Sequence, residues 1–224
     1  LEIRRKAGSK EGMGWSYYDM SLVHGMLGDA GKTLECLENS ARLFDEMGDT
    51  IGSICARSAM AKCLADMNRV DEAEGLYRQI LKMADQKDMA LDRFHALMGL
   101  ADMGAIAPEE AVPAMEDIES RLGSLQVSVL LQSFKGRAAA GAGDLEAAEA
   151  RFAEGLGIVE GLEGTEADLR RADILLSRAR VRLASGERDA GRTDAAEAGR
   201  LLLKWGRLRD AHIAGALAGD APNL

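Results

Sequence analysis

The feature of this sequence that most restricts its fold is a regular spacing of small side chains. Pairs of small residues twelve positions apart recur along the chain, and these pairs are Ser21/Thr33, Ala61/Ala73, Gly99/Ala111, Gly136/Ala148 and Ala179/Gly191. Successive pairs are separated by 40, 38, 37 and 43 residues. A period of this length indicates a tandem repeat, in which each copy is one small unit that packs on the next.

Each copy has the pattern of two amphipathic helices joined by a tight turn. Residues 14–49 show it best, because a Gly-Asp pair at 28–29 separates two stretches with helical spacing of apolar residues. Antiparallel helices approach closely only where the facing side chains are small, so each pair predicts the contact inside one hairpin. We expect the residue four positions after each pair to fill the space toward the next hairpin; these residues are Leu37, Tyr77, Met115, Phe152 and, with thinner packing, Ala195.

The period also predicts how the chain is organised. Residues 1–10 align with the second helix of a unit whose first helix is missing, residues 11–206 form five hairpins, and residues 207–224 form a C-terminal capping helix and tail. Because the sequence opens inside a unit and without an initiator methionine, we expect an upstream domain of the same parent chain.

Four segments carry a more specific pattern: LGD (27–29), RVDEAEGLYRQIL (69–81), PEEAVPAMEDI (108–118) and GAGDLEAAEARFAEGL (141–156). They resemble the tetratricopeptide repeat (TPR), in the long form of about 40 residues per repeat found in bacterial signalling proteins. The tyrosine column of that family's first helix is occupied instead by His24, Leu64, Asp102, Ala139 and Arg182. The resemblance implies an all-α, right-handed superhelical α-solenoid whose first helices line a concave groove.

Composition and charge argue against several classes of function. The formal net charge of −9 disfavours nucleic acid, whose phosphates require basic surfaces. No apolar run approaches the roughly 20 residues of a membrane span. Cys55 and Cys63 are eight positions apart on one predicted helix, about 12 Å along its axis, which exceeds the roughly 7 Å that a disulfide allows between Cα atoms. Unpaired cysteines favour a reducing, cytoplasmic location.

No motif for catalysis, a cofactor or a metal is present. The three histidines (His24, His95 and His212) lie in different repeats, and no HExxH or CxxC spacing occurs. No nucleophile, base and orienting group can be assigned together, so we expect no enzyme and no cofactor. Several arginines lie in the predicted helix 168–184. They are interpreted as partners of the acidic segment 146–166 rather than as a nucleic-acid surface.

If the geometry of the resembling family holds, a defined set of side chains lines the groove and binds a partner. These residues are Trp15, Tyr18, Leu22, Lys62, Arg93, Phe134, Arg137 and Arg180. An aromatic start followed by one cation per later unit suits an acidic or carboxylate-bearing polypeptide, because cations along a groove attract such a partner. The alternative, in which these cations are solvated or paired within the array, stays open.

Two functions fit this pattern. The first is a non-enzymatic scaffold that binds a protein or peptide segment in the concave groove. The second is a regulatory or sensor region of a larger bacterial signalling protein, such as an ATP-dependent transcription activator or a kinase, in which the repeats restrain an upstream effector domain.

Overall fold

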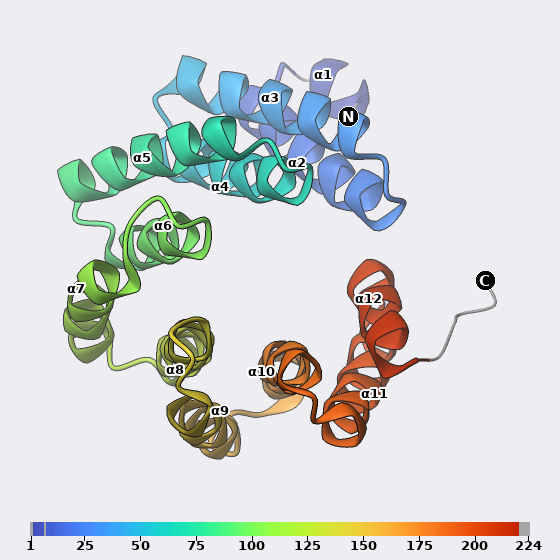
Figure 1. The fold of residues 1–224 in the computed structure, drawn as a ribbon. Coiled ribbons are helices and arrows are strands. Elements are labelled where there is room, and N and C mark those ends of the chain that lie inside the picture. The colour runs from blue at the N-terminus through green and yellow to red at the C-terminus, as the bar shows by residue number, and fades with distance from the viewer. Residues whose placement is uncertain (1, 7, 220–224) are drawn as a thin grey trace. The chain divides into compact units, whose positions relative to one another are not determined.

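A computed structural model describes residues 2–6 and 8–219, and within them all regular structure is helical (Figure 1). The twelve helices of this part of the chain are α1 Glu2–Lys6, α2 Lys10–Met26, α3 Ala30–Met47, α4 Thr50–Asp66, α5 Val70–Lys87, α6 Ala90–Asp102, α7 Pro108–Leu122, α8 Leu125–Gly141, α9 Leu145–Val159, α10 Gly164–Ser185, α11 Arg188–Lys204 and α12 Leu208–Ala218. Consecutive helices pack on one another from α2 to α6 and from α8 to α12. The prediction of an all-α solenoid of helical repeats is therefore confirmed.

The chain divides into two compact units, Leu1–Ala114 and Met115–Leu224, with the boundary inside α7. In the first unit α2 also contacts α4, and α4 contacts α6. In the second unit α8 contacts α10, and α10 contacts α12. Within each unit, therefore, the first helices of successive hairpins lie next to one another and share one face.

The predicted element bounds differ from the observed ones mainly at two places. In the predicted second helix over residues 1–10, Glu2–Lys6 forms the short helix α1, Gly8 and Ser9 are not helical, and Lys10 already begins α2. Helix α10 begins at Gly164, whereas the segment EGLEGTEAD (160–168) predicts a linker before the fifth hairpin. A helix, α12, lies within the predicted C-terminal capping segment, and residues 220–224 of the predicted tail GDAPNL (219–224) lie outside the described residues.

A Gly-Asp pair links helices at three turns: Gly28-Asp29, Gly48-Asp49 and Gly143-Asp144. The three glycines have φ values of 76°, 69° and 85°, a left-handed conformation that ends a helix at little steric cost. Each aspartate then accepts a hydrogen bond from the backbone N–H three residues later, at 2.9–3.0 Å. These carboxylates satisfy backbone donors at the start of the next helix, so two residues fix both ends of the turn.

The predicted register of small residues describes the core well. Nine of the ten small residues are buried, as are Leu37, Met115, Phe152 and Ala195, while Tyr77 is half-buried. The exception is Gly99, which is half-buried. A Cβ atom on Gly99 would lie 2.4 Å from the Tyr77 ring of α5. This glycine is therefore packed against the preceding hairpin, and the contact agrees with the prediction that Tyr77 fills the space toward the next hairpin.

Candidate interaction surface

In the first unit, α2 and α4 present matching ridges of side chains. The ridge on α2 consists of Trp15, Tyr18 and Leu22, and the ridge on α4 consists of Cys55, Ser58 and Lys62. Each residue on α4 follows its counterpart on α2 by 40 positions, which is the repeat period. Leu22 is 51% exposed and Lys62 is also exposed, whereas the other four are half-buried. The two helices thus offer one face with an apolar side and a cationic side.

The first helices α2, α4 and α6 lie next to one another, and burial and neighbouring charges shift the pKa values of side chains on them. Burial raises the pKa of Tyr18, and the charges of Cys55 and Asp19 raise it further. Burial likewise raises the pKa of Cys55, with a further contribution from the Asp92 carboxylate of α6. A thiol with a raised pKa stays protonated at neutral pH and is a poor nucleophile. Cys55 is therefore not an activated nucleophile.

Trp15 and Tyr18, the aromatic residues of this face, are held in place by contacts with the core of the hairpin. The Trp15 ring makes edge contacts with Tyr18, at a centroid distance of 5.8 Å, and with Phe44, at 4.9 Å. Phe44 is fully buried, so its ring ties Trp15 to the core of the hairpin. Aromatic side chains held in place this way make effective binding anchors, because little conformational freedom is lost when a partner packs on them.

The two predicted cations of the first unit differ in environment. Lys62 makes no ion pair or hydrogen bond within the described residues. Arg93 instead has its Nε atom 3.2 Å from an Asp85 carboxylate oxygen of α5, an ion pair whose geometry falls short of a hydrogen bond. The alternative of pairing within the array therefore holds for Arg93, and Lys62 carries the charge of this face.

In the second unit, the residues predicted to bind a partner also differ in their exposure and contacts. Phe134 is only 2% exposed, so it belongs to the core and is not available to a partner as the sequence analysis expected. The Arg137 guanidinium lies 5.7 Å from the centre of that ring and donates a hydrogen bond to Ser133 Oγ at 3.2 Å. Arg180 is exposed on α10, and no ion pair involves it in the described part of the chain.

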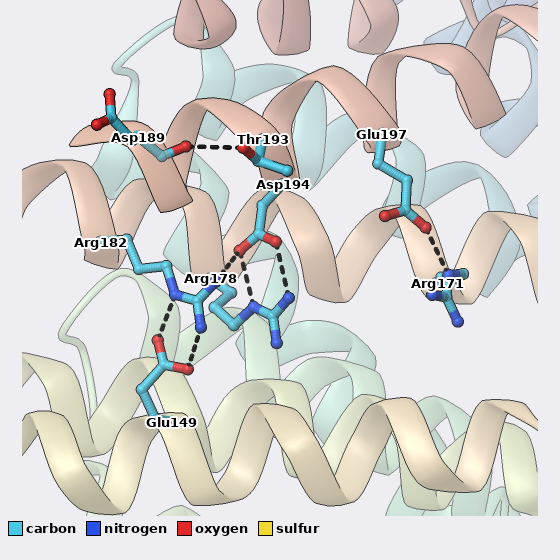
Figure 2. A network of polar contacts seen from close by, with 8 residues as sticks. All are labelled: Glu149, Arg171, Arg178, Arg182, Asp189, Thr193, Asp194 and Glu197. Atoms are coloured by element: carbon cyan, nitrogen blue, oxygen red, sulfur yellow. Dashed lines mark hydrogen bonds and ion pairs between the residues drawn. The ribbon is translucent and has the colours of Figure 1, made fainter. Parts of the chain in front are cut away.

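The other arginines of α10 are held in a network with acids (Figure 2). Arg182 donates two hydrogen bonds of 2.7 Å to the Glu149 carboxylate of α9 and one of 2.9 Å to Asp194 of α11. Arg178 donates two bonds of 2.7 Å to Asp194, which is only 5% exposed. The hydrogen bonds from Arg182 to Glu149 are the main reason why the pKa of Arg182 is raised.

The predicted pairing with the preceding acidic segment is correct for two of these arginines. Arg182 pairs with Glu149, and Arg170 pairs with Glu166 at 2.6 Å. Arg171 and Arg178 pair instead with Glu197 and Asp194 of the following helix. The arginine cluster is consequently part of the hairpin packing.

Neither a family model nor a curated protein matches this chain. In residues 2–6 and 8–219 there is no grouping of three or more His, Cys, Asp or Glu side chains that could hold a metal ion. The same residues include no helix with both the length and the apolar character needed to cross a membrane.

Proposed function

We propose that this chain is a non-enzymatic scaffold that binds a protein or peptide segment on the face formed by the first helices of its hairpins. The observation that carries the proposal is the ridge of Trp15, Tyr18 and Leu22 next to the exposed Lys62. Large apolar side chains gathered on one face are typical of protein-binding surfaces. The proposal also includes membership of the bacterial signalling type of TPR protein and a cytoplasmic location, supported by the repeat spacing and the three free cysteines.

The partner we propose has an apolar anchor and an acidic group. Leu22 and the aromatic pair supply the apolar contact, and Lys62, at the position of α4 that corresponds to Leu22, supplies the charge. In the second unit the exposed Arg180 offers the same charge to a partner of that unit. Exposed cations chiefly speed association and orient the partner, while the apolar contacts provide most of the affinity.

The test begins with peptides selected from a random phage library on the full chain. Their affinities are then measured by calorimetry for the chain and for two variants, Leu22→Asp and Lys62→Glu. The proposal predicts a loss of about tenfold or more for each variant, with an unchanged helical circular dichroism spectrum.

Lys82→Glu is the matched control, because Lys82 is an exposed lysine of the second helix α5 with no ion pair among the described residues. It is expected to change affinity by less than about twofold. Acidic peptides whose binding survives both Leu22→Asp and Lys62→Glu would reject this face.

A further inference from the structure

Besides the first-helix face, the first unit has a recessed surface between the second helices α3 and α5. Two adjoining hollows of about 360 and 260 Å³ lie there, above the side chains of α4. Both hollows are lined by Glu38 of α3, Met60 of α4, and Leu76 and Gln79 of α5. We refer to this surface, defined by these four residues, as the α3/α5 groove. The volume of the larger hollow, about 360 Å³, is near the lower limit of roughly 300 Å³ for ligand sites.

The floor of the α3/α5 groove is apolar. Leu34, Leu64 and Ala73 form a buried cluster, and the half-buried side chains of Met60 and Leu76 pack on it. Met60 and Leu76 therefore present apolar surface to the groove while they are held from below. Methionine adapts its shape to different partners, which suits a binding floor.

Three arginines that line the groove are already paired with carboxylates. At one end Arg57 pairs with Asp45 at 2.7 Å, and at the other Arg69 pairs with Glu72 at 2.6 Å. A third lining arginine, Arg42, pairs with Glu46 at 2.9 Å. These three guanidinium groups already have carboxylate partners, so an anionic ligand would have to compete for them.

Glu38 lies between these pairs and differs from them. In the part of the chain that the structure describes, its carboxylate makes no hydrogen bond or ion pair, and its charge acts on Arg69, which Glu72 already holds. The middle of the groove thus carries a negative charge next to an apolar floor. A cationic side chain with apolar neighbours complements this combination.

We propose that the α3/α5 groove binds a short polypeptide segment in which one Lys or Arg adjoins a large apolar residue. The apolar side chain packs on Met60 and Leu76, and the cation pairs with Glu38 beside the side-chain amide of Gln79. This surface consists of side chains other than those of the proposed function. An experiment can therefore reject the proposed function without rejecting binding in the groove, and the reverse.

Gly75 allows the groove to be filled without damage to the fold. It lines the groove, lies within the helix α5 and is exposed. No atom lies within 4 Å of the position of an added Cβ. Gly75→Trp therefore places a large side chain at the groove without a backbone clash, and Gly75→Ala is the matched control that alters helix propensity alone.

The experiment uses a phage library of random short peptides, selected on the full chain and depleted on the Gly75→Trp variant in each round. We expect the enriched peptides to share one Lys or Arg adjacent to Leu, Met or Phe. Synthetic copies are then titrated by calorimetry, each beside a copy in which Gln replaces the cation. The copy with Gln is expected to bind about tenfold more weakly.

Two pairs of variants locate the site. Gly75→Trp and Glu38→Gln should weaken binding by about tenfold or more, whereas Gly75→Ala and Glu35→Gln should change it by less than about twofold. Glu35 is an exposed acid on the same helix that does not line the groove. Retained helical circular dichroism shows that each variant is folded.

Three results would overturn the proposal. The first is that the enriched peptides share no cation, and the second is that Glu38→Gln and Gly75→Trp leave binding intact. The third is that free spermidine binds as tightly as the peptides. Leu22→Asp and Lys62→Glu should leave this binding unchanged. A loss with those variants would assign the peptides to the first-helix face and not to the groove.

Discussion

The hairpins α2/α3 and α10/α11 have the same register but are held together by different interactions. In α2/α3 the buried ring of Phe44 fits against Gly14, and Ser40 donates a hydrogen bond of 2.9 Å to the Gly14 carbonyl. In α10/α11 a buried carboxylate, Asp194, binds two arginines of the facing helix. The comparison teaches that the register determines which positions are buried, but not which chemistry fills them.

The position three residues after the second small residue of each pair shows this difference in chemistry. Cys36 follows Thr33 by three residues, and Asp194 follows Gly191 by three. Both residues are almost fully buried, with 7% and 5% of their surface exposed. The first hairpin places a small apolar thiol there, while the last places an ion. Beside it Ala195, also fully buried, stands where the first hairpin has the larger Leu37.

The two units also differ in their surfaces. Of the sixteen large apolar side chains that are exposed among the described residues, eleven lie in the first unit. The first-helix face and the α3/α5 groove both belong to that unit. Our proposal therefore places partner binding mainly in the first unit.

The largest expected effect comes from Phe44→Ala. Phe44 is fully buried against Gly14, Gly52 and Trp15, so the substitution leaves a cavity that rigid helices cannot close. We expect a loss of about 4 kcal/mol in the free energy of unfolding, measured by urea denaturation. A loss below about 1 kcal/mol would mean that shape does not hold this hairpin.

Asp194→Leu tests the other hairpin. Without Asp194, Arg178 has no counter-ion among its observed partners while only 16% of its side chain is exposed. We expect a loss of about 3 kcal/mol in the free energy of unfolding. The double variant Asp194→Leu/Arg178→Met should recover part of this loss, because it removes the stranded charge. Equal stability of the single and double variants would refute the ion-pair account.

A pair of glycine substitutions separates close packing from helix propensity. A Cβ on Gly52 would lie 2.4 Å from the Phe44 ring, whereas one on Gly75 meets no atom within 4 Å. Gly52→Ala should therefore cost about 2 kcal/mol. Gly75→Ala should stabilise the chain by about 0.5–1 kcal/mol, because alanine favours a helix. The same thermal or urea denaturation measures both, and changes of the same sign would contradict the contrast.

The smallest effects concern two aspartates of the first unit whose pKa values move in opposite directions. Burial raises the pKa of Asp92 above 3.8, so stability falls as the pH rises from that unfolded value through the folded one. Hydrogen bonds from Arg57 lower the pKa of Asp45, which stabilises the fold above 3.8 and is lost as the pH falls through the folded value. At about pH 7, Asp92→Asn should raise the melting temperature and Asp45→Asn should lower it.

The control for these two variants is acidic pH. Near pH 3 the Asp92→Asn difference should vanish, since wild-type Asp92 is then largely protonated in both states. The Asp45→Asn difference should shrink progressively as the pH falls. A gain from Asp92→Asn that is independent of pH would assign it to packing.

Much of the architecture could be predicted because it depends on local chemistry. The spacing of Ala61 and Ala73, or of Gly136 and Ala148, identifies positions that face each other inside a hairpin, and these residues are buried. The Gly-Asp turns could be located for the same reason, since a left-handed glycine and a capping carboxylate act within a few residues.

What sequence analysis missed depends on neighbours that are distant in the chain. A first helix contacts its own hairpin and the adjacent ones, so its periodicity alone did not reveal that Phe134 is buried. The ion pair of Arg93 with Asp85 crosses from one hairpin to the next. The α3/α5 groove arises from helices of two different hairpins, so no local pattern in the sequence predicted it.

The most direct test of the central claim, that the first-helix face of the first unit binds a polypeptide, is an NMR titration of the full chain with acidic peptides selected on it. The account predicts that the largest amide shifts cluster at Leu22, Ser58 and Lys62, with the Trp15 indole shifting as well. Saturable binding that leaves these four residues unshifted, or shifts confined to the second unit, would contradict it.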